Sequence, residues 1–226
     1  MKNYISKKTR LEILKLKPCV LLKEFPKIFS WDELERLINL RPFASNTRLR
    51  FINNESYQWG GQAWLTDPNT YPPSLIEEEL KKYHCYFSDA SRANEKLNKI
   101  CGELENTFEG HASDAHIYFT TADTTAGGFG IHYDSAHNLI VQVEGSTRFM
   151  LWDVYVNKLA SPRVVESLPV DPVIDVTLHP GDAVFVPMYS YHQALSQSKR
   201  LSVSFPVTAP PVPPQDRHWV KLRVDQ

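Results

Sequence analysis

The hydrophobic pattern of the chain changes character near residue 113. Before that point a short apolar run predicts one strand, at 18–22, and a stretch rich in aromatic and turn residues at 44–73 predicts an irregular surface with short strands. Helix-start signals and apolar residues at helical spacing predict three helices, at 31–40, 74–83 and 89–108. We therefore expect the first half of the chain to be mainly helical, with helices that pack on a sheet.

From residue 113 onward the apolar residues form short runs separated by turn residues. These runs predict strands at 115–120, 138–143, 147–152, 173–178, 183–187 and 201–207. The Glu144-Gly145 turn predicts that the second and third of them form a hairpin. Short strands with a turn every ~8–12 residues are typical of a small barrel or jelly roll.

We accordingly predict a single domain over residues 1–226, of α+β class and mainly β. An N-terminal α/β elaboration covers 1–112, a double-stranded β-helix (jelly-roll) core covers 113–208, and an extended proline-rich tail covers 209–226. The N-terminal helices are expected to flank this core.

Composition excludes several classes of function. The chain is 42% hydrophobic and 23% charged with a net charge of -1, so no bulk electrostatic attraction to nucleic acid or anionic membrane is evident. Three cysteines at unrelated spacings give neither a disulfide framework nor a zinc knuckle. The sequence lacks both a secretory leader and an apolar run of the ~18 residues that a membrane span needs. We expect a soluble cytoplasmic protein.

His132 and Asp134 form a His-x-Asp pair, and His192 follows some sixty residues later. Residues two apart on a strand share a face, and a neighbouring strand can bring in the distal histidine. Two imidazoles and one carboxylate can hold one face of an octahedral Fe(II) and leave three positions open. The same set can also make a catalytic zinc site, and single strand histidines are often only structural. Among the other histidines, we expect His116 to be polar but not a ligand, and His137 to lie beside the site or exposed.

Two separated motifs carry a resemblance to a known family. The run 128–152, GFGIHYDSAHNLIVQVEGSTRFMLW, and the run 178–192, LHPGDAVFVPMYSYH, resemble the two metal-binding halves of the Jumonji-C and cupin-like hydroxylases. The resemblance covers about residues 85–207, and the ribosomal-oxygenase-like and asparaginyl-hydroxylase-like members are the most similar in pattern. It implies a jelly-roll core, Fe(II), O2 and 2-oxoglutarate as cosubstrate, with His132, Asp134 and His192 as iron ligands. It also implies that Asn138 contacts the cosubstrate.

The chain departs from the family pattern at Thr147. Family members have a lysine or arginine there, fifteen residues after the first metal histidine, which pairs with the far carboxylate of 2-oxoglutarate. Arg148 is adjacent, but strand alternation points it to the other face. A buried carboxylate without a cation is costly, so another base has to serve. Arg200 is our candidate, because other 2-oxoglutarate oxygenases use an Arg-x-Ser after the distal histidine; Tyr118 and Ser204 are expected to add hydrogen bonds.

The resemblance implies an Fe(II)- and 2-oxoglutarate-dependent dioxygenase that hydroxylates a C–H bond, on a protein or peptide side chain rather than a free metabolite. Three alternatives remain open. Thr147 favours a cupin-type non-haem iron dioxygenase that does not use 2-oxoglutarate. The fold could also serve a non-catalytic binding module, or a tRNA- or small-molecule-modifying hydroxylase, although the near-zero net charge speaks against nucleic acid. The sequence does not indicate an oligomeric state.

Overall fold

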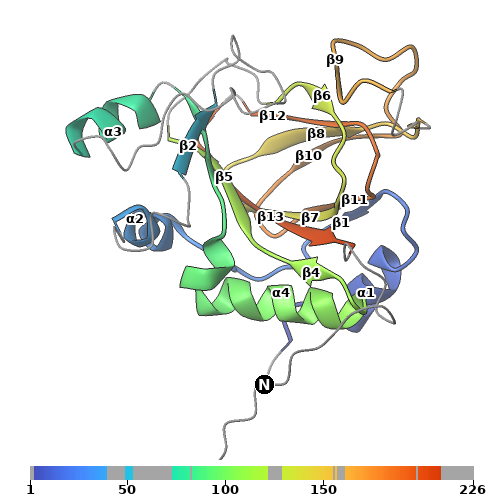
Figure 1. Cartoon of the computed structure of the whole chain (residues 1–226), viewed down its shortest axis with the longest axis horizontal. Helices are drawn as coiled ribbons and strands as arrows, with labels where there is room; N and C mark the ends of the chain where they lie inside the picture. The colour runs from blue at the N-terminus through green and yellow to red at the C-terminus, as the bar shows by residue number, and fades with distance from the viewer. Residues whose placement is uncertain are drawn as a thin grey trace, which may run out of the picture.

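Two antiparallel sheets dominate the computed structural model, which describes residues 3–39, 49–52, 73–81, 83–121, 129–154, 156, 161–196 and 198–209 (Figure 1). The larger sheet has the order β1 (Cys19–Leu21), β11 (Ala183–Val186), β7 (His137–Glu144), β13 (Arg200–Thr208), β5 (His116–Thr120), β3 (His84–Phe87), β2 (Leu49–Ile52), and β4 (Ala112–Ser113) pairs with β13. The smaller sheet has the order β10 (Ile174–Leu178), β8 (Thr147–Leu151), β12 (His192–Leu195), β6 (Ile131–His132), β9 (Val164–Val165). The predicted class, α+β and mainly β with a jelly-roll core, is confirmed.

The central strand β13 alternates strictly between two environments, as the period of two along a strand requires. One set of its residues is buried in the main hydrophobic core: Leu201, Val203, Phe205 and Val207. The other set lines a pocket between the two sheets: Arg200, Ser202 and Ser204. Its neighbour β7 does the same with Leu139, Val141 and Val143 on the core side and Asn138, Ile140 and Gln142 on the pocket side. One pair of strands therefore builds both the core and the site.

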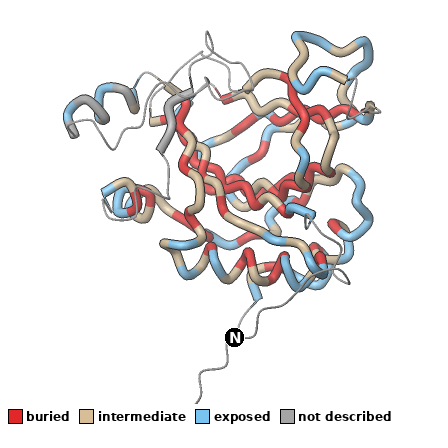
Figure 2. The backbone as a smooth tube through the Cα atoms, viewed as in Figure 1, coloured by how far each residue is buried: buried red, intermediate tan, exposed pale blue. Residues whose placement is uncertain are grey.

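The helices belong to the N-terminal half, as predicted: α1 (Lys7–Ile13), α2 (Trp31–Asn39), α3 (Pro73–Leu80), the 3-10 turn η4 (Ala90–Ala93) and α4 (Glu95–Thr107). Helix α4 runs along the larger sheet (Figure 1) and buries Leu97, Ile100 and Leu104 in the core that it shares with β13. Buried positions concentrate along the sheet strands, whereas the outer helix faces and the loop around β9 are largely exposed or intermediate (Figure 2). The larger sheet is thus covered on the side away from the pocket.

The predicted hairpin of 138–143 and 147–152 is wrong. Strand β7 pairs with β11 and β13 in the larger sheet, whereas β8 pairs with β10 and β12 in the smaller one. Gly145 has φ +70°, and a Cβ there would lie 2.2 Å from the carbonyl oxygen of Lys199. The backbone before β13 crowds this turn, and the chain crosses between sheets there instead of folding back on β7. A tight polar turn between two apolar runs does not distinguish these outcomes.

The predicted single helix at 89–108 is divided at Asn94. This residue has an extended backbone, and its side chain accepts a hydrogen bond from the backbone N–H of Leu97, so it caps α4 and separates it from η4. The sequence analysis also missed α1, β3 and β9. Within 44–73 the described residues include β2, while the rest of that stretch up to 72, Gly128 and the tail from 210 lie outside the described part. No described helix is both long and apolar enough to cross a membrane.

Candidate metal centre

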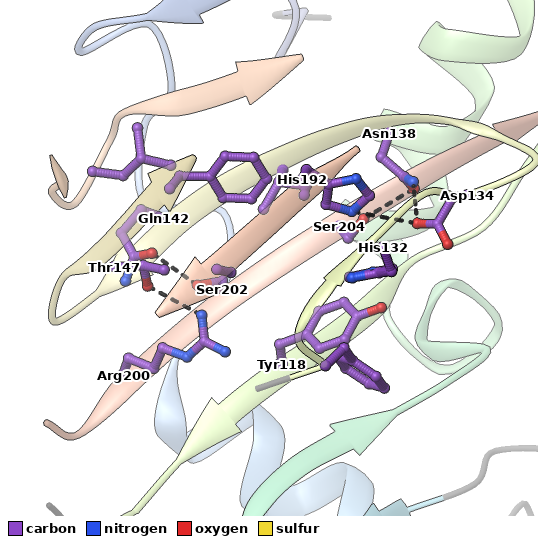
Figure 3. A pocket seen from close by; sticks show the side chains of 15 residues that line it. Tyr118, His132, Asp134, Asn138, Gln142, Thr147, His192, Arg200, Ser202 and Ser204 are labelled. Atoms are coloured by element: carbon purple, nitrogen blue, oxygen red, sulfur yellow. Dashed lines mark hydrogen bonds and ion pairs between the residues drawn. The ribbon is translucent and has the colours of Figure 1, made fainter. Parts of the chain in front are cut away.

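The three residues of the predicted triad converge at one end of the pocket (Figure 3). His132 on β6 and His192 on β12 are direct partners in an antiparallel pair, so their side chains share one face of the smaller sheet. Asp134 follows β6 rather than lying in it. One ligand atom from each of the three residues lies within 4.8 Å of the others, and His192 Nε2 is 3.7 Å from Asp134 Oδ2. This spacing can be spanned by one metal ion.

Both imidazoles are oriented by the backbone. Nδ1 of His132 lies 3.0 Å from the carbonyl oxygen of Gly130, and Nδ1 of His192 lies 3.0 Å from that of Ser190. Since a carbonyl oxygen only accepts, each Nδ1 carries the proton and each Nε2 presents a lone pair to the centre. Burial, together with the neighbouring His192, lowers the pKa of His132 to about 4 against the opposing effect of Asp134. The neutral form that a metal requires is therefore the resting form.

Asn138 orients the carboxylate of the triad. Its Nδ2 donates to Asp134 Oδ2 at 2.9 Å, and its Oδ1 accepts from the hydroxyl of Ser204 at 3.2 Å. Asn138 lies on β7 and Ser204 on β13, so this chain of hydrogen bonds connects the candidate ligand Asp134 to these two strands of the larger sheet. Hydrogen-bond partners of metal ligands fix ligand geometry and raise affinity.

Replacement of Asn138 with alanine is expected to lower Mn(II) affinity about 10- to 100-fold, because Asp134 loses the donor that holds its Oδ2. Isothermal titration with Mn(II) measures this. Asn98→Ala, at an exposed position on α4, is the matched control and should bind Mn(II) as the wild type does. Unchanged metal affinity with weakened binding of 2-oxoglutarate would instead give Asn138 the cosubstrate role that the sequence resemblance implies.

Arg163 is a residue of the centre that the sequence analysis missed. Its Nη2 lies 3.7 Å from Asp134 Oδ1, and its side chain is 41% exposed. The segment that carries it is held by the residues beside the ligands: Tyr133 N–H donates to the Arg163 carbonyl at 3.2 Å, and the Tyr191 hydroxyl donates to the Pro162 carbonyl. No signal in the sequence marks Arg163. It lies in a long connection, and it comes near Asp134 because β9, which follows it directly, pairs with β6.

The opposite end of the pocket holds Arg200 and Thr147, two of the candidate cosubstrate residues (Figure 3). Arg200 is buried and donates to the hydroxyl of Thr147 at 3.2 Å. Ser202 donates to Gln142 Oε1 at 2.8 Å, and Gln142 donates to the carbonyl of Glu144 at 2.8 Å. Tyr118 and Ser204 also line the pocket. All five predicted cosubstrate residues, Asn138, Tyr118, Thr147, Arg200 and Ser204, thus border the space that contains the triad.

Arg200 is electrostatically unusual. The residue is only 6% exposed, and its Nε lacks a hydrogen-bond partner. No carboxylate among the described residues forms an ion pair with it. Burial lowers its pKa to about 10, against the opposing effect of Tyr118. Arg148 points away, as predicted, and forms an exposed ion pair with Asp175 at 2.6 Å. A buried cation without a counter-charge marks a place where an anion is stabilised.

The two other histidines of interest lie outside the pocket lining. His116 has its Nδ1 2.8 Å from the hydroxyl of Tyr86, and burial lowers its pKa to about 4. His137 is buried, not exposed, and its Nδ1 accepts from the backbone N–H of Met188 at 3.0 Å. Neither is among the pocket residues, and the group of described residues that could hold a metal ion consists of His132, Asp134 and His192.

A family model described as the JmjC domain matches residues 88–213, more than half of the chain. The chain belongs to this family. Curated relatives are named bifunctional lysine-specific demethylase and histidyl-hydroxylase NO66: that of Drosophila persimilis is 27% identical over 164 residues, covering 70% of this chain and 23% of the relative. That of Dictyostelium discoideum is 27% identical over 182 residues, covering 77% of this chain and 34% of the relative.

Solved structures show the same fold. The ribosomal oxygenase YcfD from Escherichia coli matches with a TM-score of 0.63 and 19% identity, covering 92% of this chain and 53% of that chain. The structure of YcfD in complex with cobalt and 2-oxoglutarate matches with a TM-score of 0.58 and 18% identity, with the same coverage. This chain therefore spans about half of that solved relative and less than two thirds of the curated relatives.

Proposed function

We propose that this chain is an Fe(II)- and 2-oxoglutarate-dependent dioxygenase that hydroxylates a C–H bond. The observation that carries the proposal is one pocket with His132, Asp134 and His192 at one end and the unpaired cation of Arg200 at the other (Figure 3). A dicarboxylic 2-oxo acid has a metal-chelating end and a distal carboxylate, so it matches both ends at once. YcfD, which shares the fold, has been solved with cobalt and 2-oxoglutarate.

The metal fits the residues present. Two neutral imidazoles and one carboxylate would leave Fe(II) with one residual positive charge and three open positions. Bound iron supplies the activation of O2, coupled to oxidation of 2-oxoglutarate to succinate and CO2 and to hydroxylation of the substrate. Arg200 neutralises the distal carboxylate, with Thr147 and Ser202 as further hydrogen-bonding groups.

Part of the pocket wall is apolar. Phe149 and Leu178 from the smaller sheet and Ile140 from the larger sheet form its apolar sides. Phe149 also stacks on the ring of His192, with centroids 5.8 Å apart and an interplanar angle of 11°. The part of the pocket that the centre of a water molecule can occupy has a volume of about 50 Å³, several times the ~10–15 Å³ that one water needs. Apolar walls limit competing reactions with water.

We further propose a protein or peptide side chain as the substrate, in support of which the relatives carry the names histidyl-hydroxylase, lysine-specific demethylase and ribosomal oxygenase. The three cysteines are free, which fits the reducing cytoplasm as the location that we propose.

Anaerobic titration of the Fe(II)-loaded protein with 2-oxoglutarate tests the function directly. We expect a weak visible charge-transfer band from the chelated 2-oxo acid, which His192→Ala protein should lack. Stoichiometric iron binding without a band would contradict the proposal and favour a dioxygenase that does not use an oxo acid, the alternative to which Thr147 points.

A further inference from the structure

The segment that delivers His192 is attached to the segment that carries Asp134 by two neighbouring hydrogen bonds. The backbone N–H of Met188 donates to His137 Nδ1 at 3.0 Å, and the backbone N–H of Tyr189 donates to the Asp134 carbonyl at 2.8 Å. We call this pair of bonds the latch. One of its bonds is to a backbone group that every residue has, whereas the other depends on the side chain of His137.

The contact fixes the chemical state of His137. A backbone N–H only donates, so Nδ1 must be the unprotonated acceptor, and the neutral ring carries its proton on Nε2. Burial, together with the neighbouring His111, lowers the pKa of His137 to about 4, which agrees with a permanently neutral acceptor at physiological pH. His137 is thus a buried titratable side chain that holds the backbone without entering the pocket.

The ring of His137 is itself held in place. It lies nearly parallel to the rings of Phe108 and Phe185, with centroids 5.8 Å from both and interplanar angles of 16° and 18°. Phe108 is the C-terminal cap of α4, and Phe185 belongs to β11. The acceptor nitrogen therefore has a position set by elements of the core.

The backbone beyond Met188 needs such support. Tyr189 has φ +62°, a left-handed conformation that a bulky side chain disfavours, so the surroundings must maintain it. The next residue, Ser190, supplies the carbonyl that accepts from His192 Nδ1 at 3.0 Å and so orients the metal-binding Nε2. His137 is thus connected to His192 through its hydrogen bond with Met188, the left-handed backbone of Tyr189 and the hydrogen bond from His192 to the Ser190 carbonyl.

We propose that His137 is a positioning residue of the metal centre, which acts through the Met188 N–H to hold the 188–192 segment in the conformation that presents His192. The inference rests on the proposed metal-binding function. It assigns a role to a histidine that touches neither the metal site nor the pocket, and it separates two contributions of one ring: stacking, which serves stability, and the Nδ1 acceptor, which serves metal affinity.

Two substitutions separate these contributions. His137→Phe keeps a flat ring against Phe108 and Phe185 but removes the acceptor; His137→Asn removes the ring but places an amide oxygen near the position of Nδ1. With Co(II) alone as the probe, we expect His137→Phe to bind more weakly than wild type, by at most the ~10- to 100-fold that loss of a direct hydrogen-bond partner of a ligand costs, because His137 acts on His192 only through the backbone. We expect His137→Asn to keep affinity within about threefold while melting at a lower temperature.

Val203→Ala, a core substitution on the side of β13 away from the pocket, is the control for general destabilisation and should leave Co(II) affinity unchanged. Wild-type affinity in His137→Phe, or affinity that follows melting temperature across the three variants, would overturn the proposal. If His137→Phe does not fold, ¹H–¹⁵N spectra of the wild-type histidines decide, because a protonated Nδ1 on His137 is incompatible with the latch. A wild-type protein that binds no Co(II) at the triad would instead contradict the proposed function.

Discussion

Replacement of Asp134 with alanine is expected to abolish both metal-dependent turnover and the 2-oxoglutarate charge-transfer band. The substitution removes the only anionic ligand of the triad and leaves two neutral imidazoles, so we expect Co(II) affinity to fall more than the ~100-fold that marks loss of an outer-shell partner. The fold should persist, because Asp134 is partly exposed, follows β6 and makes its side-chain contacts within the site.

Asp175→Ala is the matched control for this experiment. Asp175 is also an aspartate paired with an arginine, but its partner Arg148 lies on the exposed side of the smaller sheet. Metal affinity and turnover should be unchanged in this variant. Wild-type Co(II) affinity in Asp134→Ala, measured alongside a circular dichroism spectrum that shows a folded protein, would remove the triad assignment altogether.

Replacement of Arg200 with methionine is expected to weaken 2-oxoglutarate binding without weakening metal binding or lowering the melting temperature of the ligand-free protein. Affinity for 2-oxoglutarate should fall by about 100-fold or more, because a buried carboxylate would lose its only cation among the described residues. Metal affinity should be unchanged, since Arg200 contacts Thr147 and none of the ligands. The ligand-free protein should melt at the same or a higher temperature, because the substitution removes a buried charge with which no described carboxylate forms an ion pair.

Thr147 and Arg148, which lie on opposite faces of β8, provide the control substitutions. Arg148→Met removes an exposed arginine and should leave 2-oxoglutarate binding as it is. Thr147→Lys in the Arg200→Met background moves the cation to the position that the family pattern prefers, and it should restore part of the affinity. An unchanged Kd for 2-oxoglutarate in Arg200→Met would contradict the role of Arg200. A lower melting temperature would show that contacts within the protein compensate the free-energy cost of burying its charge.

The sequence predicts which side chains line the pocket better than it predicts the contacts around them, for a physical reason. His132 and His192 lie on short strands and Asp134 follows one directly, so the period of two along a strand indicates the side-chain direction of the histidines. The same rule correctly directs Arg148 outward and places Arg200, Ser202 and Ser204 on one side of β13. These positions depend on local geometry that the sequence encodes within a few residues.

What the sequence does not predict depends on contacts between distant segments. The turn at Gly145, where the chain crosses between sheets, lies against the backbone of Lys199, and Arg163 is brought near Asp134 by the pairing of β9 with β6. Helix α1 is held at its start by Glu103, whose carboxylate accepts from the backbone N–H groups of Tyr4 and Ile5. Such partners are separated by tens of residues, so no local sequence pattern predicts them.

The shared use of β13 constrains how this protein can vary in length. A one-residue insertion or deletion that shifted the register of that strand would exchange its two faces over the shifted part, which would bring residues such as Arg200 and Ser202 into the core and turn Leu201 and Val203 toward the pocket. Only a bulge, such as the register irregularity already present between Leu201 and Ser202, would absorb the extra residue. We therefore expect the Arg200 end of the pocket to vary by substitution more readily than by insertion. The described residues 161–170 of the connection that carries Arg163 are exposed or intermediate, and β9 lies at the border of its sheet. Pairing of β9 with β6 and the hydrogen bonds from Tyr133 and Tyr191 fix part of this connection, so we expect changes in length outside those contacts. Such changes would alter the surroundings of Asp134 while the strand that carries Arg200 stays as it is.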